Sequence, residues 1–143
     1  MNPRLESLLL GKSSNLSLRY LEYAVVFMAL FFGQRYLAGN FEIGNASGLF
    51  MSPLGAGVVA AILTGVHTYR NDGILVSVAV AVIVVSGSTL YAVTALAHPQ
   101  PDYGLVTGVG TAMLYGVPIG ILSATVAYAL RRFAPSRSPV MSE

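Results

Sequence analysis

Few ionisable side chains lie within the apolar stretches of this chain, and each is a candidate for chemistry. Glu22 lies near the start of the first apolar stretch, and Gln34 and Arg35 lie near its end. Within a membrane, Glu22 would act as a proton or cation site, and Gln34 with Arg35 as an anion-binding or gating point. The alternative is that these are interfacial residues that end the span, with Glu22 paired to Arg19 on the preceding turn.

A small belt of hydroxyl groups is the second candidate. Ser86, Ser88 and Thr89 follow one another closely within a long apolar stretch. One interpretation is a path for a polar solute lined by these hydroxyls, which with Arg35 would form a transport route. The other is hydrogen bonding between helices, or back to the carbonyl one turn earlier.

The two histidines do not predict a metal or haem site. His67 and His98 lie at opposite ends of predicted helices, separated by roughly the 30 Å of a bilayer core. No Asp, Glu or Cys stands at ligand spacing from either, and the chain contains no cysteine. No Ser-His-Asp order, phosphate loop, paired carboxylates or HExxH motif is present. We therefore expect no cofactor, no metal and no enzymatic activity.

The composition indicates where these residues are placed. Charged residues make up 10% of the 143, against roughly 25% in soluble domains. Hydrophobic residues make up 55%, and the mean hydropathy is +0.68. So few charges cannot cover the surface of a small soluble domain. The composition thus excludes a soluble globular domain, a disordered chain and a nucleic-acid-binding protein, and it predicts that the lipid bilayer is a partner.

Four apolar stretches are long enough to cross a bilayer as helices, which needs about 20 residues. They comprise residues 18–38, 48–68, 74–97 and 105–130. Residues 76–85 alternate Val with Ala and Ser, which in a soluble protein would favour a strand. A lone strand in lipid leaves its backbone groups unsatisfied, and four long blocks do not make a barrel. The sequence predicts an all-α integral membrane four-helix bundle.

Basic residues predict the orientation of this bundle in the cell membrane. Seven of the eight Lys and Arg residues are predicted to lie on one side of the membrane. Two are in the N-terminal segment 1–17, three are in the tail 131–143, and the other two are Arg19 and Arg70. The positive-inside rule then places both termini in the cytoplasm, and Arg35 is the exception. The segment 1–17 is not a convincing secretory signal. Its residues Arg4, Leu5, Leu8, Leu9 and Lys12 predict either a short interfacial amphipathic turn or a frayed tail.

Small residues recur every four positions in two of the predicted spans, a spacing that lets helices approach closely. In the last span these are Gly104, Gly108, Ala112, Gly116, Gly120 and Ala124. In the second span they include Ser52, Ala56 and Ala60. The partner helix belongs either to the same chain or to a second copy.

The same two spans each contain a proline, Pro53 and Pro118, which predicts a kinked or opened helix. Two similar hairpins in parallel are therefore one interpretation of the bundle. The unequal distances from each proline to the next arginine, Arg70 and Arg131, argue against it.

The segment Ser52-Pro53-Leu54-Gly55-Ala56-Gly57, followed by Gly65 and a glycine-rich last span, resembles small glycine-rich four-helix membrane proteins of archaea. That group has no known function, and the resemblance implies no site residues. The sequence favours a structural or accessory membrane subunit that packs through its small-residue faces. Its partners would be further copies of the chain or a larger membrane protein. The alternative is a small oligomeric channel or transporter that uses Arg35 and the kinked spans.

Overall fold

The computed structural model describes residues 3–41, 53–93 and 104–133. Its helices are α1 (Pro3–Leu10), α2 (Ser14–Phe41), α3 (Pro53–Asn71), α4 (Ile74–Val93) and α5 (Leu105–Phe133). No strand occurs in these ranges, so the predicted all-helical fold is confirmed. The stretch whose alternation resembled a strand lies within α4 and is helical.

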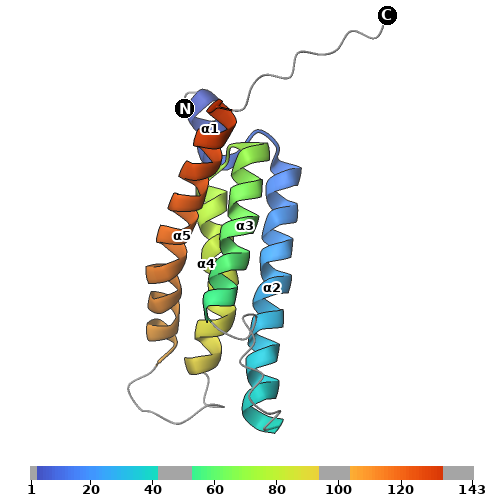
Figure 1. Cartoon of the computed structure of the whole chain (residues 1–143), viewed down its shortest axis with the longest axis vertical. Coiled ribbons are helices and arrows are strands. Elements are labelled where there is room, and N and C mark those ends of the chain that lie inside the picture. Colours follow the sequence, from blue (N-terminus) through green and yellow to red (C-terminus); the bar gives the residue numbers. More distant parts are fainter. Residues whose placement is uncertain (1–2, 42–52, 94–103, 134–143) are drawn as a thin grey trace, which may run out of the picture.

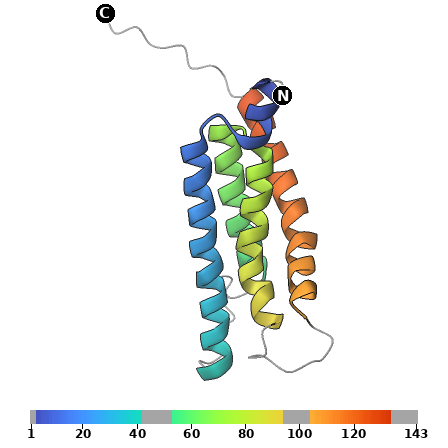
Figure 2. The ribbon, with the colours of Figure 1, turned by 180° about the vertical axis from the view of Figure 1, so that it is seen from behind.

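The four long helices lie side by side, and short α1 sits at one end of the bundle beside the end of α5 (Figure 1). Helix α4 packs against each of the other four helices. Seen from both sides, α2 and α5 flank the α3–α4 pair (Figures 1 and 2). The core accordingly centres on small and β-branched residues of α4, among them Val80, Ala81 and Val84, which are fully buried.

The two hairpins do not pack alike. Helix α5 packs extensively on α4, whereas α2 makes few contacts with α3 and packs mainly on α4. This difference does not favour two equivalent hairpins.

Local signals explain where the helices begin and end near α1. Helix α1 stops at Gly11, whose φ of +94° is a conformation that suits glycine, and whose N–H donates to the carbonyl of Ser7 at 2.9 Å. Ser13 caps α2, because its hydroxyl accepts the N–H of Leu16 at 3.4 Å. Helix α3 stops at Asp72, which has a φ of +62° and donates its N–H to Thr68 at 2.9 Å.

At three glycines the backbones of neighbouring helices come into direct contact. A Cβ at Gly116 of α5 would lie 2.9 Å from the backbone nitrogen of Val82 on α4. A Cβ at Gly120 of α5 would lie 2.7 Å from the Cα of Val78, also on α4. A Cβ at Gly87 of α4 would collide with the carbonyl of Met28 on α2 and lie 2.9 Å from the Cα of Met28. The absence of a side chain is therefore what allows these helices to touch.

Within the described ranges, three helical stretches are long and apolar enough to cross a membrane: Ser7–Ala38, Ile74–Tyr91 and Leu105–Phe133. Helix α3 is not among them. The predicted span 48–68 begins in residues that lie outside the described ranges, so only its part from Pro53 onward is seen.

Candidate functional site

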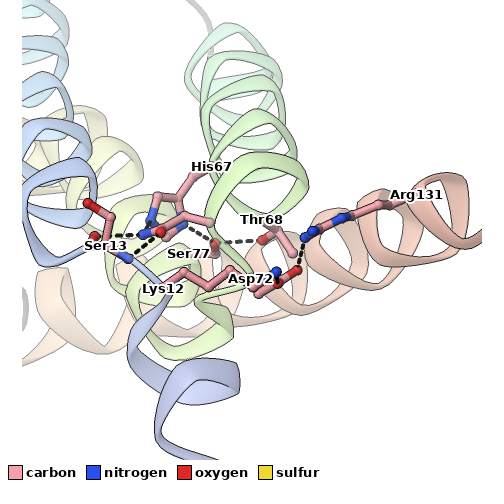
Figure 3. A network of polar contacts seen from close by, with 8 residues as sticks. Lys12, Ser13, His67, Thr68, Asp72, Ser77 and Arg131 are labelled. Carbon is pink, nitrogen blue, oxygen red and sulfur yellow. Dashed lines mark hydrogen bonds and ion pairs between the residues drawn. The ribbon is translucent and has the colours of Figure 1, made fainter. Parts of the chain in front are cut away.

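A buried polar network occupies the end of the bundle where α1 meets α2 and where α3 turns into α4 (Figure 3). Its members are polar residues of α2, α3 and α4 that are at most 6% exposed, together with one serine of the linker between α1 and α2. They are Ser13, Ser17, Thr64, His67, Thr68, Asn71 and Ser77. The network thereby joins the N-terminal linker to the α3–α4 hairpin.

Asn71, the last residue of α3, connects the hairpin to the linker. Its Oδ1 accepts the N–H of Ser13 at 2.7 Å, and its Nδ2 donates to the carbonyl of Ser13 at 3.0 Å. The same Nδ2 donates to the hydroxyl of Ser17 at 2.8 Å. Its backbone carbonyl also accepts the N–H of Lys12 at 2.8 Å. Because the Ser13 N–H needs an acceptor, the amide is oriented with its NH₂ group toward Ser17.

His67 lies in the middle of the network and is fully buried. Its Nδ1 is 2.8 Å from the hydroxyl of Ser77, and its Nε2 is 3.3 Å from Nδ2 of Asn71. Because the hydroxyl hydrogen of Ser77 is directed to the carbonyl of Gly73, Nδ1 of His67 carries the proton and donates to Ser77, and Nε2 is left as an acceptor. Tyr20 of α2 packs edge-on against the ring at a centroid distance of 5.1 Å.

The hydroxyl of Ser77 has its hydrogen-bonding capacity used within the bundle. It donates to the carbonyl of Gly73 at 2.9 Å and accepts from Thr68 at 2.7 Å. Ser77 and His67 have the spacing of a nucleophile and its base, but Ser77 is 0% exposed and a substrate cannot reach it. The arrangement therefore satisfies buried polar groups and fixes the helix ends.

Two glycines leave the space that the network needs. A Cβ at Gly11 would collide with the side-chain amide of Asn71. A Cβ at Gly73 would lie 3.0 Å from Cε1 of His67 and 3.0 Å from the backbone nitrogen of Gly11. The linker and the α3–α4 turn are thus in direct backbone contact.

Asp72 forms an ionic cluster at the rim of the network. One carboxylate oxygen contacts Nζ of Lys12 at 2.6 Å, and the other accepts from the guanidinium of Arg131 at the end of α5. Burial by itself would raise the pKa of Asp72, but the hydrogen bonds and charges of Lys12 and Arg131 outweigh it and lower that pKa below its usual range. Through this ionic cluster, the end of α5 is joined to the N-terminal linker and the α3–α4 turn.

The residues that the sequence singled out for chemistry lie elsewhere. Glu22 is exposed on α2, and within the described ranges no ion pair joins it to Arg19. Gln34 and Arg35 are half-buried near the far end of α2, where Nε of Arg35 is buried with no hydrogen-bond partner. The structure does not bring these residues into the network.

The hydroxyl belt of α4 bonds to its own helix. Ser86 donates to the carbonyl of Ile83 at 2.6 Å, and Ser88 donates to that of Val85 at 3.0 Å. Thr89 lies 3.3 Å from the carbonyl of Ser86. These contacts match the second of the two interpretations, bonding back along the helix.

Five of the six small residues in the α5 series lie on its buried face, and Gly104 just before the helix is exposed. The buried members are Gly108, Ala112, Gly116, Gly120 and Ala124. On α3, Ala56 and Ala60 are fully buried, and Ser52 lies outside the described residues. At Gly116 and Gly120 the partner is α4 of the same chain, which the sequence left open.

The prolines occupy different positions in their helices. Pro118 lies inside α5, which continues through it to Phe133. Pro53 is the first residue of α3, and a kink there would involve residues outside the described ranges.

Sequence patterns alone do not predict the network, because an isolated histidine such as His67 suggests a metal or haem ligand. The short turn Asn71-Asp72-Gly73 is the feature of the sequence that points to the network. A short turn between two helices brings the polar residues before it close to those after it. His98 lies outside the described residues, and among those described no group of three or more His, Cys, Asp or Glu could hold a metal ion.

Comparison of the chain with protein families, with curated proteins and with solved structures finds no match. The resemblance to glycine-rich archaeal membrane proteins therefore stays a prediction.

Proposed function

We propose that the protein is an integral membrane protein of the cell membrane that serves as a structural or accessory subunit. Its four long helices span the bilayer, and the polar network lies on the cytoplasmic side with both termini. The positions of the basic residues support this orientation, because Lys12, Arg19, Arg70, Arg131 and Arg132 lie at or near the network end.

The observation that carries the proposal is the distribution of large and small apolar residues. Large side chains on α5 point outward, with Val106 at 86%, Leu114 at 68% and Leu122 at 65% exposure. The outward faces of α2 and α3 also carry large apolar residues, while the buried face of α5 consists of glycine and alanine. Soluble monomers rarely expose contiguous apolar patches larger than a few hundred Å². Lipid is the solvent that suits such a surface.

The interior favours a subunit over a solute path. Backbones meet directly at Gly87, Gly116 and Gly120, and the hydroxyls of the α4 belt are bonded to their own helix. Because α4 already occupies the glycine series of α5, a partner protein or further copy would dock on the outward apolar faces. The proposed docking surface thus differs from the small-residue faces that the sequence favoured, because α4 covers those of α5 within the chain.

Purification from the native membrane in a mild detergent tests this proposal. We expect the chain to elute with a stoichiometric membrane-protein partner or as a homo-oligomer, and its deletion to reduce the amount of that complex. A lone monomer whose deletion changes the abundance of no membrane complex would contradict the subunit proposal.

One observation favours a second candidate, an oligomeric channel or transporter. The buried Nε of Arg35 has no hydrogen-bond partner, and an unsatisfied charged group in a membrane domain marks candidate solute pathways. Anion flux into liposomes that contain the chain would test it, with Arg35→Gln as the variant and Arg19→Gln as the control. Flux that only Arg35→Gln abolishes supports transport, and absence of flux in the unmodified chain contradicts it.

A further inference from the structure

We propose that Lys12 and Arg131, held side by side by Asp72, bind the phosphate of an anionic phospholipid at the network end of the bundle. The inference rests on the proposed membrane location and adds a lipid class and a binding site to it. The three side chains meet at one point, although they come from the N-terminal linker, the α3–α4 turn and α5 (Figure 3).

The ionic cluster presents cations outward and hides its anion. The side chain of Asp72 is 14% exposed, while those of Lys12 and Arg131 are 55% and 39% exposed. Each oxygen of the carboxylate contacts one of the cations, so both oxygens are engaged. Lys has three N–H donors and Arg has five, and most of them stay available for a second anion. The carboxylate thus positions two donors next to each other without neutralising both.

The surroundings suit a phospholipid more than a free anion. Arg19, Arg70 and Arg132 are exposed at the same end, and no ion pair involves them within the described ranges. They add positive potential at the level where anionic headgroups lie. Exposed apolar side chains adjoin the cluster in sequence, namely Leu10 before Lys12 and Leu130 before Arg131. These groups would contact the acyl chains below the phosphate.

Native mass spectrometry of the full chain in a neutral detergent, offered equal amounts of phosphatidylglycerol and phosphatidylcholine, tests the site. We expect the unmodified chain to retain phosphatidylglycerol preferentially. Lys12→Gln should lower that retention about fivefold, the effect of one basic residue at an anionic surface. Arg70→Gln removes the same charge at the same end and is the matched control. At 0.5 M salt, charges act over only a few Å because ions screen them. Under this condition Arg70→Gln should lower retention of phosphatidylglycerol less than about twofold.

Each result decides between explanations. Equal losses in Lys12→Gln and Arg70→Gln, or no preference for phosphatidylglycerol, would overturn the site. Lys12→Arg should restore retention, and failure to do so with an unchanged unfolding temperature would also overturn it. Displacement of the lipid by millimolar inorganic phosphate would assign the site to free phosphate and overturn the lipid proposal. A chain that alkaline carbonate extracts from membranes would instead refute the proposed membrane location.

Discussion

Substitution of Gly87 by alanine tests the claim that backbone contact holds the bundle together. The added Cβ would lie 2.9 Å from the Cα of Met28 and even closer to its carbonyl oxygen. Ordinary contact begins at 3.4 Å, and the obstructing atoms belong to the backbone of α2. No side-chain rotation relieves the overlap, so α2 and α4 must separate, which also weakens the dispersion contacts along their seam.

The magnitude follows from two opposing effects. Alanine in place of glycine in a helix interior is worth up to about 1 kcal/mol in favour of folding. Overpacking a close-packed interface costs about 1–3 kcal/mol. Gly65 of α3 has no atom within 4 Å of its Cβ position, so Gly65→Ala experiences only the favourable effect. The favourable effect is common to both variants, so they should differ by the overpacking cost, about 1–3 kcal/mol in free energy of unfolding.

Reversible unfolding in mixed micelles, followed by circular dichroism as the fraction of SDS rises, measures this difference. We expect Gly87→Ala to unfold at a lower SDS fraction than the unmodified chain and Gly65→Ala at an equal or higher one. If Gly87→Ala is as stable as Gly65→Ala, α2 and α4 are not in backbone contact and the packing described above is wrong.

Three further predictions concern the network end, and the same unfolding assay measures each. Asn71→Ala leaves the N–H of Ser13 without its acceptor and should cost about 1–3 kcal/mol, and a loss below that of a surface substitution would contradict the network. Gly11→Ala forces alanine to a φ of +94° against the Asn71 amide, so it should cost at least about 1–2 kcal/mol, and unchanged stability would show that this linker geometry is wrong. Asp72→Asn should cost about 1 kcal/mol at pH 7, since the cations around the carboxylate are largely exposed. Because the pKa of Asp72 is lowered in the folded state, its contribution to stability is complete above the ordinary carboxyl range near 4 and is lost as the pH falls through the lowered value. The stabilities of the unmodified chain and Asp72→Asn should therefore converge in acid. A difference in stability that does not change with pH would refute the ion pairs.

Hydrophobic length and small-residue spacing predicted the helices and part of their packing. The apolar stretch that begins at residue 105 corresponds to α5, and the spacing-four series in it lies on the buried face of that helix. Such patterns are readable because each residue contributes through its own size and polarity. The series did not identify its partner, since the approach of Gly116 to Val82 depends on tertiary arrangement.

The polar network was harder to predict because each member has an ordinary local explanation. Ser13 caps α2, Asn71 ends α3, and His67 occupies the last turns of the same helix α3. Only the fold brings Ser13 and Asn71, which are 58 residues apart, into contact. The contact between His67 and Ser77 was more accessible, because a short turn between two helices places residues at equal distances from it face to face. The role of Gly87 in packing also depends on the fold, because nothing in the sequence around it identifies Met28 of α2 as its neighbour.

Labelling of single cysteines tests the membrane orientation most directly, because the chain has no native cysteine. Three exposed positions along α5 serve as reporters: Leu105→Cys at its start, Leu122→Cys in its middle and Phe133→Cys at its end. In sealed right-side-out vesicles, a membrane-impermeant maleimide should label Leu105→Cys at once and Phe133→Cys only after permeabilisation. Leu122→Cys should react only after denaturation in SDS. Rapid labelling of Leu122→Cys in intact membranes would contradict a bundle that spans the bilayer.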